Sequence, residues 1–312
     1  MLEGQARHAE VPSRDLRYET FEIKTLTPHI GAELRGLDLS QPLPDEQHKE
    51  LRRAFQDWMV LVFPDQQLTR DQHKALARQF GRLHTHPMRR QKSNESSPDS
   101  LAGSTPDSSS RFDPEILPVK TTADSAYTAG DGWHTDVTCD EIPPLGSMLY
   151  ITETPESGGG DTLFADMCLA YELLSETMRG FLSGLTAVHD GAIPYVGSYK
   201  STPPKGGYPR SEHPVVTRHP DSGRKVLYVN AGFTSHIVGL SRAESRALLD
   251  LLFRHIDSTP RLYCRVQWRP NTLTFWDNRC VLHRARPYDS SEPRVMHHTR
   301  IAGDPATESA LA

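Results

Sequence analysis

Short apolar runs separated by turn-forming residues constrain the fold of this chain more than any other feature. Residues 59–63, 148–151 and 273–276 are such runs, and each has the length of a buried strand rather than of a helix. The 312-residue sequence contains 24 prolines and 21 glycines, which supply the turns that a chain of short strands needs. The pattern predicts a mainly β protein, a sandwich or barrel with flanking helices.

Helical signals are fewer and more local. Apolar side chains between Leu51 and Trp58 fall on one face of a helix predicted over residues 44–58. Capping boxes at residues 69–72 and 241–244 mark the beginnings of two further helices. We expect these helices to lie outside the β core.

Composition along the chain predicts one domain at residues 19–304. Residues 1–18 are polar and mixed in charge, and we interpret them as a flexible N-terminal tail, with a C-terminal tail at 305–312. Residues 89–131 include a run rich in Ser, Pro, Asp and Gly, with few apolar side chains to offset the entropy of ordering. This insertion is either a lid over a site or a solvated surface loop.

Charge and hydropathy exclude several function classes. The formal net charge is -5 at pH 7, so there is no basic signature for nucleic acid. No run of about eighteen apolar residues occurs, so no membrane span is expected. The four cysteines form no C-x-x-C pair, which favours a reduced, cytoplasmic protein. We expect a homo-oligomer, a dimer or tetramer, that acts on a small anionic molecule.

His134 and Asp136 form the first candidate site. In an extended segment, residues i and i+2 point to the same side, so the imidazole and the carboxylate converge. Two histidines and one carboxylate make the facial triad that holds non-haem Fe(II) and leaves positions for other ligands. From this pair alone, an ordinary His and Asp on a solvated strand is the simpler interpretation.

The C-terminal β region offers the remaining parts of such a site. His283 follows a predicted strand and turn, and Arg294 opens the last predicted strand. Arginine suits the bidentate capture of a carboxylate, such as the far end of a 2-oxo acid that chelates iron. Thr162 could add a hydroxyl donor to the same carboxylate. We interpret Asp277 and Asn278, just before this region, as turn formers.

Nine blocks carry a family pattern in a fixed order: residues 30–33, 36–39, 80–87, 133–136, 159–162, 213–216, 227–230, 276–279 and 294–297. In their order and joint presence they resemble the Fe(II)/2-oxoglutarate-dependent dioxygenases of the taurine dioxygenase / 2,4-D dioxygenase family, which includes alkylsulfatases. The resemblance runs from about residue 21 to 303.

The resemblance implies a fold, a reaction and residue roles. The fold would be a double-stranded β-helix, or jelly roll, with helices outside. The reaction would couple oxidative decarboxylation of 2-oxoglutarate, to succinate and CO₂, with hydroxylation of a substrate by O₂. No catalytic residue is expected beyond the metal centre. The implied residues are His134, Asp136 and His283 for Fe(II), Arg294 with Thr162 for 2-oxoglutarate, and His86 for the substrate anion.

Two departures from the family pattern bear on the substrate. Taurine and alkylsulfate members carry a second arginine four residues after the cofactor arginine, where this chain has His298, with Arg300 two residues later. His298 and Arg300 share a face of a strand, so both are candidate substrate-binding residues. Gly130 replaces a polar side chain that contacts substrate in the taurine enzyme. The sequence therefore predicts an aryloxyalkanoate, or a sulfonate or sulfate ester other than taurine.

Two alternatives accompany this prediction. An oxygenase of the same fold could desaturate or rearrange another carboxylate substrate, because the outcome depends on how the substrate lies. A non-catalytic β-helix binding module would keep the fold without the metal chemistry.

Overall fold

A computed structural model describes residues 11, 13–86, 113–121, 130–198, 202–204 and 206–304. Its largest element is a seven-stranded sheet in the order β1-β2-β3-β13-β5-β15-β4. The neighbours pair antiparallel, except β2 and β3, which are parallel. The strands are β1 (Glu22–Thr25), β2 (Ala32–Arg35), β3 (Val60–Phe63), β13 (Thr272–Asp277), β5 (Gly146–Glu153), β15 (Arg294–Ile301) and β4 (Ile116–Thr121).

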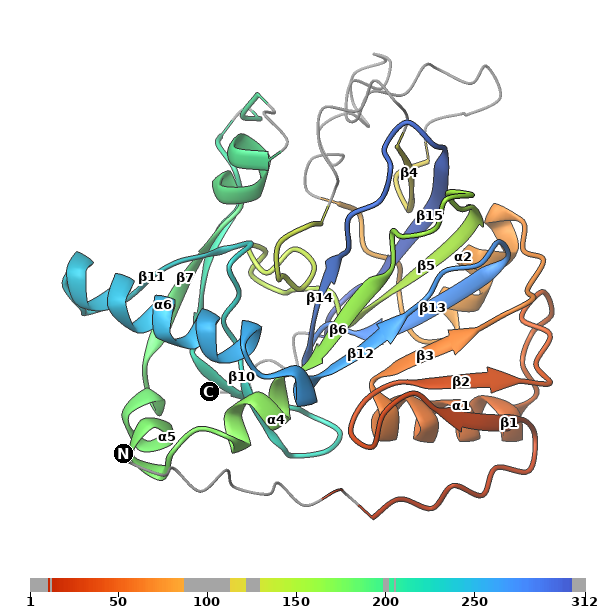
Figure 1. The fold of residues 1–312 in the computed structure, drawn as a ribbon, viewed down its shortest axis with the longest axis horizontal. Helices are drawn as coiled ribbons and strands as arrows, with labels where there is room; N and C mark the ends of the chain where they lie inside the picture. The colour runs from red at the N-terminus through yellow and green to blue at the C-terminus, as the bar shows by residue number, and fades with distance from the viewer. Residues whose placement is uncertain are drawn as a thin grey trace.

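Three smaller sheets complete the β structure. The sheet β12-β6-β14 packs against the inner face of the large sheet, where the Phe164 and Trp276 rings meet at 5.4 Å. The sheets β11-β7-β8 and β10-β9 lie on the other side of the molecule from β1 (Figure 1). Their strands are β6 (Thr162–Asp166), β12 (Tyr263–Val266), β14 (Val281–Ala285), β7 (Thr186–Asp190), β8 (Arg210–Pro214), β9 (Val216–Arg218), β10 (Lys225–Leu227) and β11 (Thr234–Ile237).

Alternation along the strands separates two hydrophobic clusters. In β5, Met148 and Tyr150 face the outer cluster, and Leu149 and Ile151 face the inner one. Helices α1 (Asp45–Trp58) and α2 (Arg70–Arg78) cover the outer face, where Phe55 stacks on the ring of Phe275 at 3.9 Å. Both faces of the sheet are therefore buried, which explains the continuous apolar runs at residues 60–63 of β3 and 148–151 of β5.

Further helices cover the inner cluster: α4 (Met167–Glu172), α5 (Glu176–Leu182) and α6 (Arg242–Asp257). The predicted capping boxes are confirmed at the first residues of α2 and α6, where Thr69 and Ser241 accept from the backbone N–H three residues on. The predicted mainly β class with flanking helices is also confirmed. Within the described residues, every helix is too short or too polar to cross a membrane.

The structure adds elements that the sequence analysis did not predict. Residues 116–121, inside the predicted insertion, form the edge strand β4, which pairs with β15. Apart from 113–121 and 130–131, the insertion lies outside the described residues, as do 1–10 and 305–312. Arg14, in the predicted N-terminal tail, lies 4.2 Å over the Trp58 ring and donates to the Pro28 carbonyl at 2.9 Å.

Candidate active site

His134, Asp136 and His283 converge on one point at the inner face of the large sheet. One ligand atom from each lies within 4.8 Å of the others. The backbone of His134 pairs with that of His283 in both directions, at 3.1 and 2.7 Å. Only this one bridge is strand-like, because the chain turns at Asp136, and Val137 takes a φ of 52°. The pairing with β14, rather than a long local strand, therefore aligns the three side chains.

The backbone of Gly132 orients the His134 ring, and Gly130 and Gly232 leave room for it. His134 Nδ1 donates to the Gly132 carbonyl at 2.7 Å, which leaves Nε2 with a free lone pair for a metal. A Cβ on Gly232 would lie 2.7 Å from His134 Cβ, and one on Gly130 would lie 3.1 Å from Cε1. Gly130 also has a φ of 77°. A side chain at Gly130 would therefore be strained and would press on the ligand ring.

The Asp136 carboxylate is buried and held from several sides. Ser147 donates to Oδ2 at 2.5 Å, and Arg300 donates to Oδ1 at 3.3 Å. His298 Nε2 lies 3.2 Å from Oδ2. Burial alone would raise the pKa of Asp136, but the nearby Arg300 and His298 outweigh it and hold that pKa well below its usual value. Asp136 is therefore ionised, as a metal-ligating carboxylate must be.

Asn278 links this site to the large sheet. Its Nδ2 donates to Ser147 Oγ at 2.9 Å, and its Oδ1 accepts from Trp276 Nε1 at 2.9 Å. Thr135, between the two metal-ligand candidates, also donates to Asn278 Oδ1 at 3.1 Å. The sequence analysis treated Asn278 as a turn former, and that prediction missed these contacts. The block at residues 276–279 was the only sequence signal for them.

His283 is buried between aromatic rings. Its ring lies 4.8 Å from that of Trp276 and 5.9 Å from that of Phe164. Burial, together with the neighbouring His134, holds the pKa of His283 well below its usual value. The imidazole is therefore neutral, which is the form that binds metals.

Arg294 and Thr162 are the first residues of β15 and β6, which belong to two different sheets. Arg294 Nη2 donates to the Gly160 carbonyl at 2.8 Å, while its buried Nε has no hydrogen-bond partner. Thr162 Oγ1 accepts from Trp268 Nε1 at 2.9 Å, so its own proton is oriented away from that indole. Among the described residues, no carboxylate forms an ion pair with Arg294. Both residues thus offer buried donors to an anion.

His86 lies beside an aromatic cluster that we define as Tyr195, Tyr208 and Phe233. Tyr195 OH and His86 Nε2 are 3.0 Å apart, and the rings of Tyr195 and Tyr208 stack at 5.5 Å. The cluster packs with Val137, the residue after Asp136. Phe233 follows Gly232, which touches His134. The aromatic cluster therefore lies next to the chain segment that carries His134 and Asp136.

Comparisons with known proteins identify the family of this chain. The family model "Taurine catabolism dioxygenase TauD, TfdA family" matches residues 22–301. The chain belongs to this family. A Sphingobium herbicidovorans protein named (S)-phenoxypropionate/alpha-ketoglutarate-dioxygenase is 35% identical over 94% of this chain and 98% of that protein. A putative alpha-ketoglutarate-dependent sulfonate dioxygenase of Schizosaccharomyces pombe is 34% identical over 96% of this chain and 74% of its own length.

Solved structures agree with this membership. A crystal structure of a taurine dioxygenase from Burkholderia xenovorans is 33% identical, with a TM-score of 0.73 over 92% of each chain. AAD-2, solved with Mn(II) and N-oxalylglycine, is 27% identical, with a TM-score of 0.72 over 91% of this chain and 98% of its own. The predicted family and enzyme class, a 2-oxoglutarate-dependent dioxygenase that needs Fe(II) and O₂, are confirmed. A non-catalytic module is thereby disfavoured.

The residues of this family member fit the metal and cosubstrate that the class requires. Two imidazoles and one ionised carboxylate form the donor set of a facial Fe(II) triad. A buried guanidinium with an unpartnered Nε suits the distal carboxylate of 2-oxoglutarate.

A second group of potential ligands, His219, Asp277 and Cys280, does not fit a metal in the same way. His219 Nε2 lies 3.0 Å from Asp277 Oδ2, and its Nδ1 accepts from the Ser222 N–H at 3.2 Å. Arg279 donates to both oxygens of Asp277, at 2.8 and 2.6 Å. Because the ring nitrogens and the carboxylate are already used, we interpret this group as a structural network.

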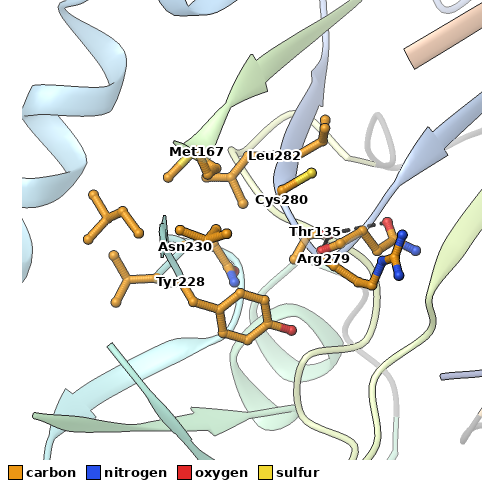
Figure 2. Close-up of a pocket in the computed structure, with 12 residues that line it drawn as sticks. Thr135, Met167, Tyr228, Asn230, Arg279, Cys280 and Leu282 are labelled. Atoms are coloured by element: carbon orange, nitrogen blue, oxygen red, sulfur yellow. Dashed lines mark hydrogen bonds between the residues drawn. The ribbon is translucent and has the colours of Figure 1, made fainter. Parts of the chain in front are cut away.

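A small cavity lies apart from the candidate metal and cosubstrate residues. Figure 2 shows Thr135, Met167, Asn230 and Leu282 around it. None of His134, Asp136, His283 and Arg294 lines this cavity. The cavity is therefore separate from the candidate metal and cosubstrate residues.

Proposed function

We propose that this dioxygenase hydroxylates an organic acid that carries an aromatic ring, of the aryloxyalkanoate type. The observation that carries the proposal is the aromatic cluster, which packs on Val137 directly after Asp136. Aromatic side chains bind a flat ring by offset or edge-to-face contacts, which a small aliphatic sulfonate does not offer. Relatives named for phenoxypropionate and for 2,4-dichlorophenoxyacetate, 35% and 32% identical, support the same substrate type.

In this proposal His134, Asp136 and His283 hold Fe(II). When bound, the metal with 2-oxoglutarate and O₂ supplies the oxidising chemistry that yields succinate, CO₂ and a hydroxylated substrate. The Gly132 carbonyl fixes the tautomer of His134, and Ser147 and Arg300 fix the Asp136 carboxylate. These contacts orient the ligands before the metal arrives, which raises metal affinity.

Arg294 and Thr162 are proposed to hold the distal carboxylate of 2-oxoglutarate. Their burial strengthens a charge-assisted hydrogen bond, because little water competes for the donors. The register of β15 on β5 shifts directly after this point, between Val295 and Met296. Such irregularities re-aim side chains at the edges of sites, and this one adjoins the arginine.

The three residues predicted to bind substrate fall into two groups. His86 belongs to the wall formed by the aromatic cluster, and we propose that it contacts the substrate there. His298 and Arg300 contact Asp136 instead, so we propose that they position the metal ligand. The buried Nε of Arg300 has no hydrogen-bond partner and is the donor that a substrate anion would use.

Fold and cellular setting complete the proposal. The large sheet facing β12-β6-β14, with metal ligands between them, supports a double-stranded β-helix, or jelly roll. The four cysteines are buried and free, which supports a reducing, cytoplasmic location. The homo-oligomeric state stays a prediction.

A substrate screen tests the proposed function. Purified protein with Fe(II), 2-oxoglutarate and O₂ is given phenoxypropionate enantiomers, phenoxyacetate, taurine, other alkylsulfonates and alkyl sulfates, and succinate and substrate products are measured. We expect the aryloxy acids to give the highest kcat/KM. Faster turnover of an aliphatic sulfonate or sulfate would contradict the aromatic assignment, and a desaturated or rearranged product would replace hydroxylation as the outcome.

A further inference from the structure

Tyr288 lies where the cofactor arginine meets the glycine-rich turn before β6. It occupies the connection between β14 and β15 and forms an isolated backbone bridge with Gly159. The guanidinium carbon of Arg294 lies 5.3 Å from the centre of the Tyr288 ring. This geometry is a cation–π contact, which orients the guanidinium over the ring.

Glycines make this close approach possible. Gly159 and Gly160 have φ values of 85° and 68°, in the left-handed region. A Cβ on Gly159 would lie 3.1 Å from Tyr288 Cβ. A Cβ on Gly160 would lie 3.1 Å from Arg294 Nε and 3.3 Å from Tyr288 Cδ1. The turn, the tyrosine and the arginine therefore form one packed unit.

Two buried donors in this unit are unsatisfied. The Tyr288 hydroxyl and Arg294 Nε are both buried, and neither has a partner in good hydrogen-bond geometry, while the hydroxyl lies near enough to the guanidinium to oppose the lowering of the Arg294 pKa by burial. A buried polar group without a partner costs free energy, so such groups commonly mark where a ligand binds. A hydroxyl donor and a guanidinium side by side are complementary to a carboxylate.

We propose that Tyr288 is a further residue of the 2-oxoglutarate site. Its hydroxyl donates a hydrogen bond to the distal carboxylate, and its ring orients Arg294 by the cation–π contact. The inference rests on the proposed assignment of Arg294 to 2-oxoglutarate, and it adds a residue that the sequence analysis did not single out. It also gives the turn at residues 158–160 a role, because that turn seats Tyr288 against Arg294.

Equilibrium binding without turnover tests this proposal. Mn(II)-loaded protein is titrated calorimetrically with 2-oxoglutarate and with 2-oxopentanoate, which keeps the chelating end and lacks the distal carboxylate. Tyr288→Phe removes the hydroxyl and keeps the ring, and Tyr288→Leu removes both. A charge-assisted hydrogen bond predicts a Kd for 2-oxoglutarate that is roughly tenfold or more higher in Tyr288→Phe. Tyr288→Leu should weaken binding further, and the Kd for 2-oxopentanoate should stay unchanged in Tyr288→Phe.

Tyr171→Phe is the matched control, because Tyr171 also places its ring beside a guanidinium, that of Arg179 at 5.9 Å, but lies on α4. It should leave both Kd values unchanged. Thermal unfolding and Mn(II) content of each variant show that the fold and the metal site are intact. An unchanged Kd for 2-oxoglutarate in Tyr288→Phe, or an equal loss for both ligands, would overturn the inference alone. Wild-type protein that binds neither ligand would overturn the proposed function as well.

Discussion

The inner face of β15 and the aromatic cluster are built in different ways. Along β15, Arg294, Met296, His298 and Arg300 alternate with outward residues, so one strand serves both the proposed cosubstrate end and the proposed metal end of the site. The aromatic cluster instead comes from irregular segments, with Tyr195 on the π-helical turn Ile193–Ser198 and Phe233 on a turn. In the proposed function, the reaction thus depends on strand register, and substrate preference depends on loops that can vary without disturbing the sheet.

Removing a metal ligand should abolish metal binding and turnover completely. His134→Ala deletes one of three donors, so we expect Fe(II) binding and succinate formation to be lost together. Iron content and succinate release measure this, and His236→Ala, a histidine on β11, is the control that should keep both. Full activity in His134→Ala would show that the metal lies elsewhere.

Removing the cofactor arginine should affect one ligand only. Arg294→Ala removes two charge-assisted hydrogen bonds of about 1.5–3 kcal/mol each, which corresponds to an increase of about 100-fold or more in the KM for 2-oxoglutarate. Iron content should change little, because among the described residues no hydrogen bond joins Arg294 to His134, Asp136 or His283. An unchanged KM would mean that the cosubstrate is anchored elsewhere.

Loosening the Asp136 network should weaken metal binding by less. Asn278→Ala frees Ser147, and Arg300→Gln removes the positive charge beside Asp136. Loss of such outer contacts typically lowers metal affinity by about 10- to 100-fold. Anaerobic Fe(II) titration checks this. If Arg300→Gln raises the substrate KM and leaves metal affinity intact, Arg300 binds the substrate anion instead.

Changes in the aromatic cluster should be the mildest and the most selective. Phe233→Leu keeps most of the volume and removes the ring, so an aromatic contact worth about 0.5–1.5 kcal/mol is lost. We expect the KM of an aryloxy acid to rise about 2- to 10-fold, while Fe(II) and 2-oxoglutarate binding stay unchanged. An equal effect on an aliphatic acid would sink the idea that the cluster recognises a ring.

Much of the part of the site that lies on strands could be predicted from the sequence. Short apolar runs bounded by turn residues identified β3, β5 and β13, and the residues proposed for the metal lie together in the structure. The strand β14 was not predicted, although it carries His283, because its residues 281–285 mix apolar and charged side chains in a short segment. The structure nevertheless brings His283 together with His134 and Asp136, and its role as a metal ligand stays a prediction.

The sequence by itself determined the fold class, the helix beginnings and the residue types that the chemistry requires. These signals are local or periodic, and they need no knowledge of distant partners. Only the tertiary structure decided that His134 pairs with His283, that His298 and Arg300 turn to Asp136, and that Asn278 supports Ser147. It also brought Tyr288 to Arg294. These contacts join segments far apart in the chain, and their geometry follows from strand register and packing, which a single sequence does not specify.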